Sequence, residues 1–237
     1  MTKETPFILS LQVGTPRTLG TEGAPDPMDR TWTTGFFKEP VTESLSLGPA
    51  GLVGDGVADR RVHGGPEKAV LAYSAHHYSD WEAILDRRLP YGAFGENFTM
   101  VGQSEVDVCI GDRYAVGETL IEVSQPRQPC WKLARRWRVP DLAARVQESG
   151  RTGWYFRVRR EGRVAPGDLL TLLERPFPEW TIAKANAIMG QHPADPAACA
   201  ALAACPALSA SWRQTIESRA AGKAVDSLSR LVGPNAP

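Results

Sequence analysis

The sequence predicts a mainly β fold with helices, of the α+β class, in which a closed or nearly closed β-barrel carries a small three-helix appendage. Short strand-like runs separated by turn residues fill most of the first 174 residues. Glycine and proline account for 22 and 19 of the 237 residues, which favours a turn-rich chain over a helical bundle. The last 57 residues instead contain 16 alanines and few β-branched runs. We therefore divide the chain into an N-terminal segment (1–28, partly loop), a barrel domain (29–176) and a three-helix extension (177–237).

The clearest strand signals are short runs rich in β-branched and aromatic residues, each bounded by turn residues. Tight turns are expected at residues 117–118 and 161–162, where a glycine stands next to a glutamate between two such runs. The strands predicted in this way are 68–73, 113–116, 119–124, 154–159 and 169–173.

Helices are expected at two places in the barrel domain. Residues 77–88 place Trp81, Ile84 and Leu85 at helical spacing, and residues 140–150 begin with a proline and end with a glycine. In the extension, Thr181 caps a helix that ends near residue 190. Asp195 and Pro196 begin a second helix, Ser209 or Ser211 begins a third, and a shorter piece follows at 224–231.

Composition and charge exclude several classes of function. Basic and acidic residues balance at 27 each, so no overall field draws the protein to a nucleic-acid polymer or to an anionic membrane. The four cysteines form no CxxC pair, and no run of residues has the length and hydrophobicity of a transmembrane span. We expect a cytoplasmic protein with reduced thiols. Motifs for P-loop nucleotide binding, zinc peptidases and serine hydrolases are absent.

The strongest chemical signal is a cysteine in a stiff, basic loop. Cys130 follows Pro126, Arg127 and Pro129 and precedes Lys132. The prolines restrict the backbone, and nearby cations favour the thiolate, which acts both as a nucleophile and as a soft metal ligand. The alternative is a small buried hydrophobic residue beside a tryptophan, and the residues alone leave both interpretations open. Structural roles are expected for Cys109, Cys199 and Cys205.

Three other segments offer candidate polar groups. Paired glycines, Gly64 and Gly65, present backbone N–H groups suited to a phosphate, and the histidine and cations around them add positive charge, although an ordinary basic turn explains them equally well. Glu96 and Asn97 follow a glycine turn and offer polar groups to a pocket, unless turn chemistry alone accounts for them. Lys38 is a single charge in an apolar run, a pattern typical of a snorkelling lysine.

Four segments occur together and in order: TTGFFKEPV, VHGGPEKAV with a following HHY, FGENFT and VSQPRQPCWKL. As a set they resemble the YiiM-type branch of the MOSC family, whose domain is similar to the C-terminal domain of molybdenum cofactor sulfurase. The resemblance covers residues 38–173, and the segment RPFPEWTIAKANAI resembles the entry to the three-helix extension of that branch.

The resemblance implies a MOSC-type β-barrel and binding of the molybdenum cofactor, a pterin dithiolene that carries a phosphate. It implies that Cys130 is the metal ligand, and that Lys38, His63, Arg127 and Cys130 are the catalytic residues. Together with the polar segments above, the implied cofactor-binding set is Lys38, His63, Gly64, Gly65, Lys68, Glu96, Asn97, Arg127 and Cys130.

The function implied by the resemblance is reduction of small N-hydroxylated compounds, such as 6-hydroxylaminopurine, to amines as a detoxification activity. The chain lacks iron–sulfur and flavin fingerprints, so a separate flavoprotein or ferredoxin-like electron donor is expected. The extension would shape the pocket mouth, dock this donor or form a homodimer interface. Two alternatives remain: a cysteine-dependent hydrolase or transferase with Cys130 as nucleophile and His63 as base, and a non-catalytic carrier of the molybdenum cofactor.

Overall fold

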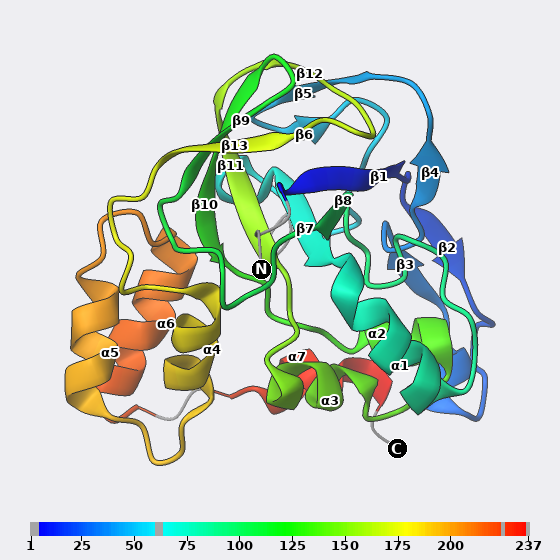
Figure 1. Cartoon of the computed structure of the whole chain (residues 1–237). Helices are drawn as coiled ribbons and strands as arrows, with labels where there is room; N and C mark the ends of the chain where they lie inside the picture. Colours follow the sequence, from blue (N-terminus) through cyan, green and yellow to red (C-terminus); the bar gives the residue numbers. More distant parts are fainter. Residues whose placement is uncertain (1–4, 60–63, 224–225, 236–237) are drawn as a thin grey trace.

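An eight-stranded sheet forms the centre of the structure, a computed structural model that describes residues 5–59, 64–223 and 226–235 (Figure 1). Its strand order is β13-β9-β10-β11-β7-β8-β1-β4, and every pair is antiparallel except β7 with β8. The strands are β1 (Phe7–Val13), β4 (Glu39–Val41), β7 (Val70–Ser74), β8 (Phe98–Val101), β9 (Arg113–Val116), β10 (Thr119–Pro126), β11 (Trp154–Arg160) and β13 (Leu170–Glu174). The five strands predicted from sequence are all present, with bounds shifted by at most two residues.

The sheet is nearly closed but does not form a continuous closed barrel, which agrees with the predicted closed or nearly closed barrel. β1 pairs with β8 along one edge, and its second half, from Leu11 to Val13, pairs with β4. Only the first residues of β1 are left to reach the opposite end of the sheet. There, a single bridge joins Phe7 to Leu169, and the Ile8 N–H donates to the Asp168 carbonyl at 3.0 Å. The sheet curls until its ends touch at this bridge, without a continuous ladder between them.

The N-terminal segment contributes more structure than predicted, because β1 lies inside the main sheet. A two-stranded sheet follows, formed by β2 (Arg17–Leu19) and β3 (Trp32–Thr34). A three-stranded sheet of β12 (Gly162–Val164), β5 (Leu45–Gly48) and β6 (Gly51–Leu52) lies at the other side of the fold, at the top of Figure 1.

Three short helices cover the lower part of the sheet in Figure 1: α1 (Tyr78–Leu85), α2 (Lys132–Trp137) and α3 (Leu142–Ser149). Their buried side chains form a second hydrophobic core, which includes Trp81, Leu133 and Val146. α1 and α3 confirm the two helices predicted in the barrel domain, whereas α2 was not predicted. The described ranges contain no helix whose length and hydrophobicity would let it cross a membrane.

The three C-terminal helices begin at the predicted caps. They are α4 (Ile182–Gly190), α5 (Pro196–Ala203) and α6 (Ala210–Ala220). The Thr181 hydroxyl accepts from the Lys184 N–H, Asp195 accepts from two N–H groups, and Ser209 accepts from the Trp212 N–H. Their apolar faces join the core of the main sheet, so the extension is packed onto the sheet.

After α6 the chain returns to the main domain. α7 (Leu228–Leu231) and the 3₁₀ turn Gly233–Asn235 lie beside α2 and α3, far from the other C-terminal helices (Figure 1). The Arg230 carbonyl accepts from the Trp131 N–H at 2.8 Å, and an Arg230 Nη donates to the Gln147 side chain at 2.6 Å. We refer to residues 226–235 as the C-terminal tail.

A buried carboxylate joins three arginines across the sheet. Glu122 on β10 is 2% exposed and accepts from Arg113 at 2.7 Å, from Arg157 at 3.1 Å and from Arg159 at 2.7 Å. Burial raises the pKa of Glu122, but the hydrogen bonds and charges of the arginines outweigh it and hold the pKa below its ordinary value. The charged form of Glu122 therefore stabilises the fold.

We predict that Glu122→Gln lowers the free energy of unfolding at pH 7 by about 3 kcal/mol, because three arginines lose a buried charged partner. The Glu122 contribution is complete above the ordinary glutamate pKa and is lost as the pH falls through the lowered pKa of the folded state. Urea unfolding should therefore show that the two proteins converge in acid. Glu174→Gln, at an exposed partner of Arg113, serves as the control and should cost less than about 1 kcal/mol.

Candidate functional site

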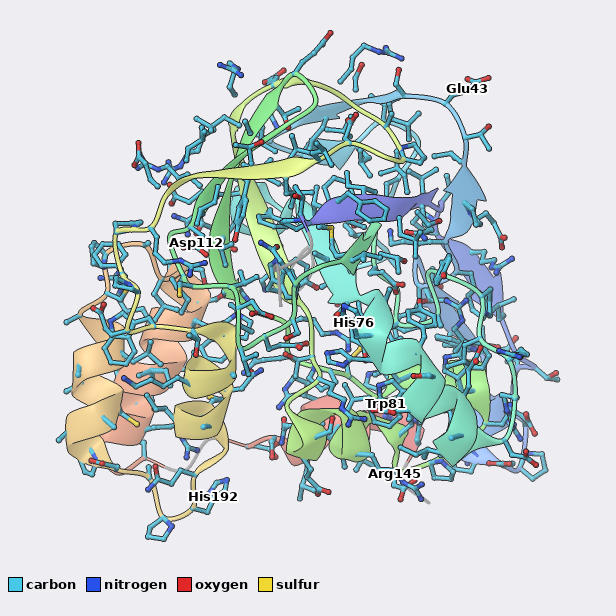
Figure 2. The ribbon with its side chains drawn as sticks, in the orientation of Figure 1. Glu43, His76, Trp81, Asp112, Arg145 and His192 are labelled. Atoms are coloured by element: carbon cyan, nitrogen blue, oxygen red, sulfur yellow. The ribbon has the colours of Figure 1, made fainter. Side chains whose placement is uncertain are left out.

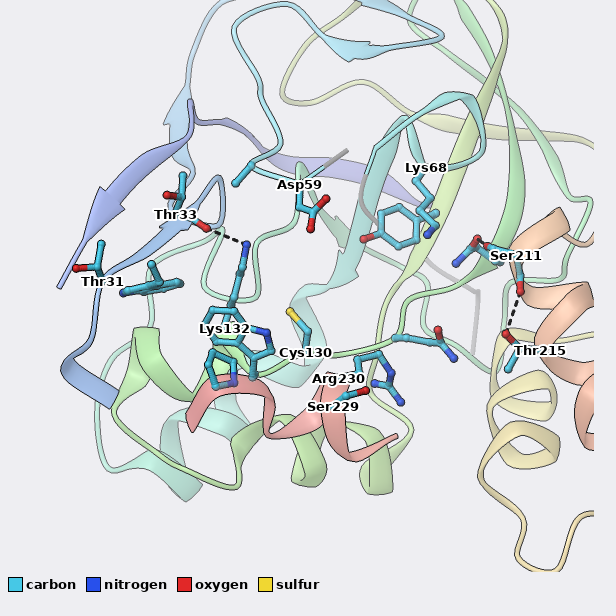
Figure 3. Close-up of a pocket in the computed structure, with 17 residues that line it drawn as sticks. Thr31, Thr33, Asp59, Lys68, Cys130, Lys132, Ser211, Thr215, Ser229 and Arg230 are labelled. Atoms are coloured by element: carbon cyan, nitrogen blue, oxygen red, sulfur yellow. Dashed lines mark hydrogen bonds between the residues drawn. The ribbon is translucent and has the colours of Figure 1, made fainter. Parts of the chain in front are cut away.

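Two cavities meet at Cys130. The smaller has a volume of about 470 Å³ and lies between the loops around Lys38, Gly64 and Phe94. The larger, of about 990 Å³, opens on the other side of Cys130 and is drawn in Figure 3. Five residues line both cavities: Ala58, Lys68, Cys130, Lys132 and Tyr155.

The loop that carries Cys130 is held at both ends. β10 ends at Pro126, although a proline was expected to stop the strand before this residue, and α2 begins at Lys132. The Arg127 N–H donates to the Gly153 carbonyl at 3.0 Å, and the Leu133 N–H donates to the Cys130 carbonyl at 3.0 Å. The Cys130 side chain is 8% exposed, and it faces the cavities. Cys130 is thus buried and also lines both cavities, so its position is compatible with either interpretation left open by the sequence.

Arg127 brings an unpaired cationic donor into the smaller cavity. The residue is 4% exposed, and its Nη2 donates to the Phe94 carbonyl at 3.3 Å. Its Nη1 is buried and has no hydrogen-bond partner in the described part of the chain. A buried, unsatisfied guanidinium group is costly, so this atom is available to an anionic ligand that enters the cavity.

Lys38 lies in the same cavity but is paired with a carboxylate. Its Nζ donates to Asp55 Oδ1, and the Asn97 amide donates to the other oxygen of Asp55 at 2.9 Å. Burial lowers the pKa of Lys38, while Asp55 and the more distant Glu96 oppose this shift. The sequence analysis missed Asp55, for which the only available signal is its position between two glycines.

Glu96 does not line either cavity. It is completely buried and accepts from the backbone N–H groups of Gly92 at 2.8 Å and Phe94 at 3.0 Å, as well as from the Tyr78 hydroxyl. These contacts hold the turn that positions Phe94 and Asn97. Turn chemistry, the alternative stated for this segment, explains Glu96.

The glycine pair and Lys68, predicted to bind the cofactor, line the smaller cavity. Gly64 and Gly65 line the smaller cavity with φ values of +71° and +82°, a backbone conformation that favours glycine. Lys68, which lines both cavities, has a pKa lowered by burial. His63 lies outside the described residues, so its predicted role remains a prediction.

Tyr155 is a further residue that the sequence analysis missed. It lies on β11 opposite Gln125 of β10, and its ring lines both cavities. Burial raises the pKa of Tyr155 to about 12, with Arg127 opposing and Cys130 adding to the shift. The phenol is therefore protonated at neutral pH. Its alternation with the buried Trp154 and Phe156 was the available signal, since alternate residues of a strand face opposite sides.

The other three cysteines lie in the core, as predicted. Cys109, Cys199 and Cys205 are at most 3% exposed and line neither cavity. Burial raises the pKa of Cys109 and of Cys205. Within residues 5–59, 64–223 and 226–235, no group of three or more His, Cys, Asp or Glu side chains is placed to hold a metal ion.

Comparison with known proteins identifies the family. The MOSC domain matches residues 59–171, and the YiiM-like, 3-alpha helix domain matches residues 180–222. The uncharacterized protein YflK of Bacillus subtilis is 43% identical over 213 residues, which cover 90% of this chain and 94% of YflK. The protein YiiM of Escherichia coli is 36% identical, over 84% of this chain and 91% of YiiM. The chain is a YiiM-like member of the MOSC family.

Structural comparison agrees with this assignment. The crystal structure of YiiM from Geobacillus stearothermophilus superposes with a TM-score of 0.76 at 39% identity, covering 91% of this chain and 99% of that one. A protein of Gibberella moniliformis named "Reductase" is 39% identical over 154 residues, which are 63% of this chain but only 27% of the fungal protein. At the level of the family, the MOSC domain is associated with binding of the molybdenum cofactor.

We predict that a small thiol reagent such as iodoacetamide modifies Cys130 first in the native protein, because only its sulfur among the four thiols lines a cavity. Peptide mapping should place the first equivalent of label on Cys130, and Cys130→Ser should remove this fast phase. Early label on Cys109, Cys199 or Cys205 would contradict the assignment of an accessible thiol.

Proposed function

We propose that this MOSC protein binds the molybdenum cofactor in the smaller cavity, with the Cys130 thiolate as the protein's ligand to molybdenum, and reduces N-hydroxylated compounds to amines. One observation supports the proposal: Cys130 lines the same cavity as Arg127, whose buried Nη1 has no hydrogen-bond partner among the described residues. The thiolate is a soft ligand of the kind that molybdenum accepts, and the guanidinium suits the phosphate of the pterin.

The donor set around the cavity fits this cofactor. Cys130 lacks neighbouring ligands that would complete a metal site among the described residues, so a metal bound there must bring ligands of its own, as the pterin dithiolene does. Lys68 adds a basic group to the wall, whereas the charge of Lys38 is offset by Asp55, which lines the same cavity. At Gly64 and Gly65 no side chain separates the backbone from a ligand, which allows close approach of a phosphate.

In this proposal the bound cofactor supplies the two-electron chemistry. The protein binds the cofactor, orients the substrate and donates a proton to the departing oxygen. Conversion of R–NH–OH to R–NH₂ and water consumes two electrons and two protons. Tyr155 lies where the cavities meet and carries its proton at neutral pH, so its hydroxyl can donate to the departing oxygen. Arg127 neutralises the anionic end of the cofactor. Proton delivery by His63 is retained as part of the proposal.

The electrons come, in this proposal, from a separate flavoprotein or ferredoxin-like protein in the cytoplasm, and the activity serves to detoxify N-hydroxylated base analogues. Support for a reductase comes from the fungal relative of that name, which this chain matches over only part of its length.

A cysteine hydrolase or transferase is the competing function, with a histidine as the general base. None of the described residues that line either cavity is a histidine. His76 lies beside α1 and His192 at the outer end of the C-terminal helices, as Figure 2 shows. The base predicted for the competing function, His63, lies outside the described residues, and a non-catalytic carrier would use the same cavity as the reductase.

We predict that Cys130→Ala, made in a host that synthesises the cofactor, folds but retains no molybdenum and reduces no N-hydroxylated substrate. Elemental analysis and pterin fluorescence measure the loading, and conversion of 6-hydroxylaminopurine with a chemical electron donor measures turnover. Cys205→Ala, which alters a buried thiol outside the cavities, is the matched control and should behave as the parent protein does.

The alternatives give different results in the same experiment. Full molybdenum occupancy in Cys130→Ala would refute the ligand assignment. Parent protein that is loaded but never reduces the substrate with any donor would indicate a carrier. Activity of metal-free protein that a thiol-directed inhibitor abolishes would indicate a hydrolase or transferase.

We predict that Arg127→Gln weakens retention of the cofactor about tenfold or more, because a charged hydrogen bond is worth about 1.5–3 kcal/mol. Loss of molybdenum during gel filtration measures the effect. Arg145→Gln, on the exposed face of α3 (Figure 2), is the control and should leave retention unchanged. Equal retention in all three proteins would show that Arg127 does not contact the cofactor.

A further inference from the structure

The larger cavity shares Cys130 with the smaller one but has a far wall of different origin. α6 contributes Ser211 and Thr215, and the C-terminal tail contributes Ser229 and Arg230 (Figure 3). None of these residues lines the smaller cavity. All four lie beyond residue 171, where the match to the MOSC domain ends. The two cavities are therefore built from different parts of the chain and meet at one sulfur atom.

The far wall combines neutral hydrogen-bonding side chains with one cation, Arg230. Gln128, Ser211, Thr215 and Ser229 are uncharged donors and acceptors. Three cations line the larger cavity, Lys68, Lys132 and Arg230, together with the carboxylate of Asp59. Lys132 Nζ donates to the Thr33 carbonyl at 3.0 Å, and Arg230 donates to the Pro129 carbonyl.

Flat apolar surface accompanies these polar groups. Trp32 and Trp131 line the larger cavity, with ring centroids 5.8 Å apart, and Tyr155 lines both cavities. Arg135 lies over one face of each tryptophan ring, at 5.8 Å and 4.8 Å from the two centroids. Aromatic faces beside neutral hydrogen-bonding groups are suited to a planar heterocycle. The volume of about 990 Å³ is sufficient for a molecule of this kind.

We propose that the larger cavity is the substrate site, that it takes a planar N-hydroxylated heterocycle, and that side chains of α6 and the C-terminal tail select this substrate. The inference rests on the proposed reductase function. The N–OH group would lie at Cys130 and Tyr155, while the ring would extend toward Ser211, Thr215 and Ser229. The MOSC domain thus holds the cofactor, and the C-terminal residues hold the substrate.

A pair of substitutions on α6 tests whether the larger cavity binds the substrate separately from the cofactor. Thr215 and Ser218 both donate to the carbonyl four residues earlier, at 3.0 Å, but only Thr215 lines the larger cavity. In cofactor-loaded protein without an electron donor, calorimetry measures binding of 6-hydroxylaminopurine separately from turnover. Thr215→Trp should weaken binding at least tenfold and leave the molybdenum content unchanged, whereas Ser218→Trp should change neither.

A second variant of the cavity wall, outside α6, distinguishes weaker substrate binding from a folding defect in α6. Ser229→Trp, in the C-terminal tail, should also weaken binding at least tenfold and retain molybdenum, and the retained metal reports an intact fold. Unchanged binding in both wall variants, or no binding by the parent, would overturn the inference. So would loss of molybdenum from both variants to the level of Cys130→Ala, because the cavities would then be a single site. Failure of the reductase proposal is separate: it appears as absence of amine product from loaded parent protein.

Discussion

The position of Cys130 depends on hydrogen bonds that fix the backbone on both sides of it. The loop from Arg127 to Trp131 has no secondary structure of its own, so its polar groups must find partners elsewhere. Gly153 binds its beginning, and the C-terminal tail binds its end through the Trp131 N–H and the Pro129 carbonyl. Asn235 donates to the Trp131 carbonyl at 3.2 Å. With these contacts the sulfur is held at the border between two cavities, and both proposed ligands depend on that placement.

Charge is distributed unequally around this sulfur. In the smaller cavity a lysine is neutralised by Asp55, while the buried Nη1 of Arg127 has no partner among the described residues. Elsewhere in the fold, Glu122 binds three arginines, and the buried Nε atoms of Arg157 and Arg219 also lack a partner in the described part of the chain. Because an unsatisfied buried donor costs stability, its presence at a cavity wall marks a place where the protein is arranged for a ligand and not only for its own folding.

Sequence analysis succeeded where the signal is local. The caps Thr181, Asp195 and Ser209 accept from N–H groups within three residues, and a short window of sequence contains all the partners. Strands with alternating side chains and good turn residues were found in the same way. α2 was missed because its six residues follow Trp131 without a capping side chain. The sequence left open whether the barrel is closed or nearly closed, because closure depends on which partner each edge of β1 takes, and no local pattern records this choice.

The sequence by itself determined the fold class, the three C-terminal helices, the family and the one cysteine worth examining. These follow from residue periodicity, capping side chains and an ordered set of short motifs. Only the tertiary structure decided that Asp55 pairs with Lys38, that Glu96 serves a turn, that Tyr155 lies between the cavities, and that the C-terminal tail reaches the Cys130 loop. The physical reason is separation along the chain: Arg230 and Pro129 are 101 residues apart, and such contacts are selected by packing of the whole core and not by any segment alone.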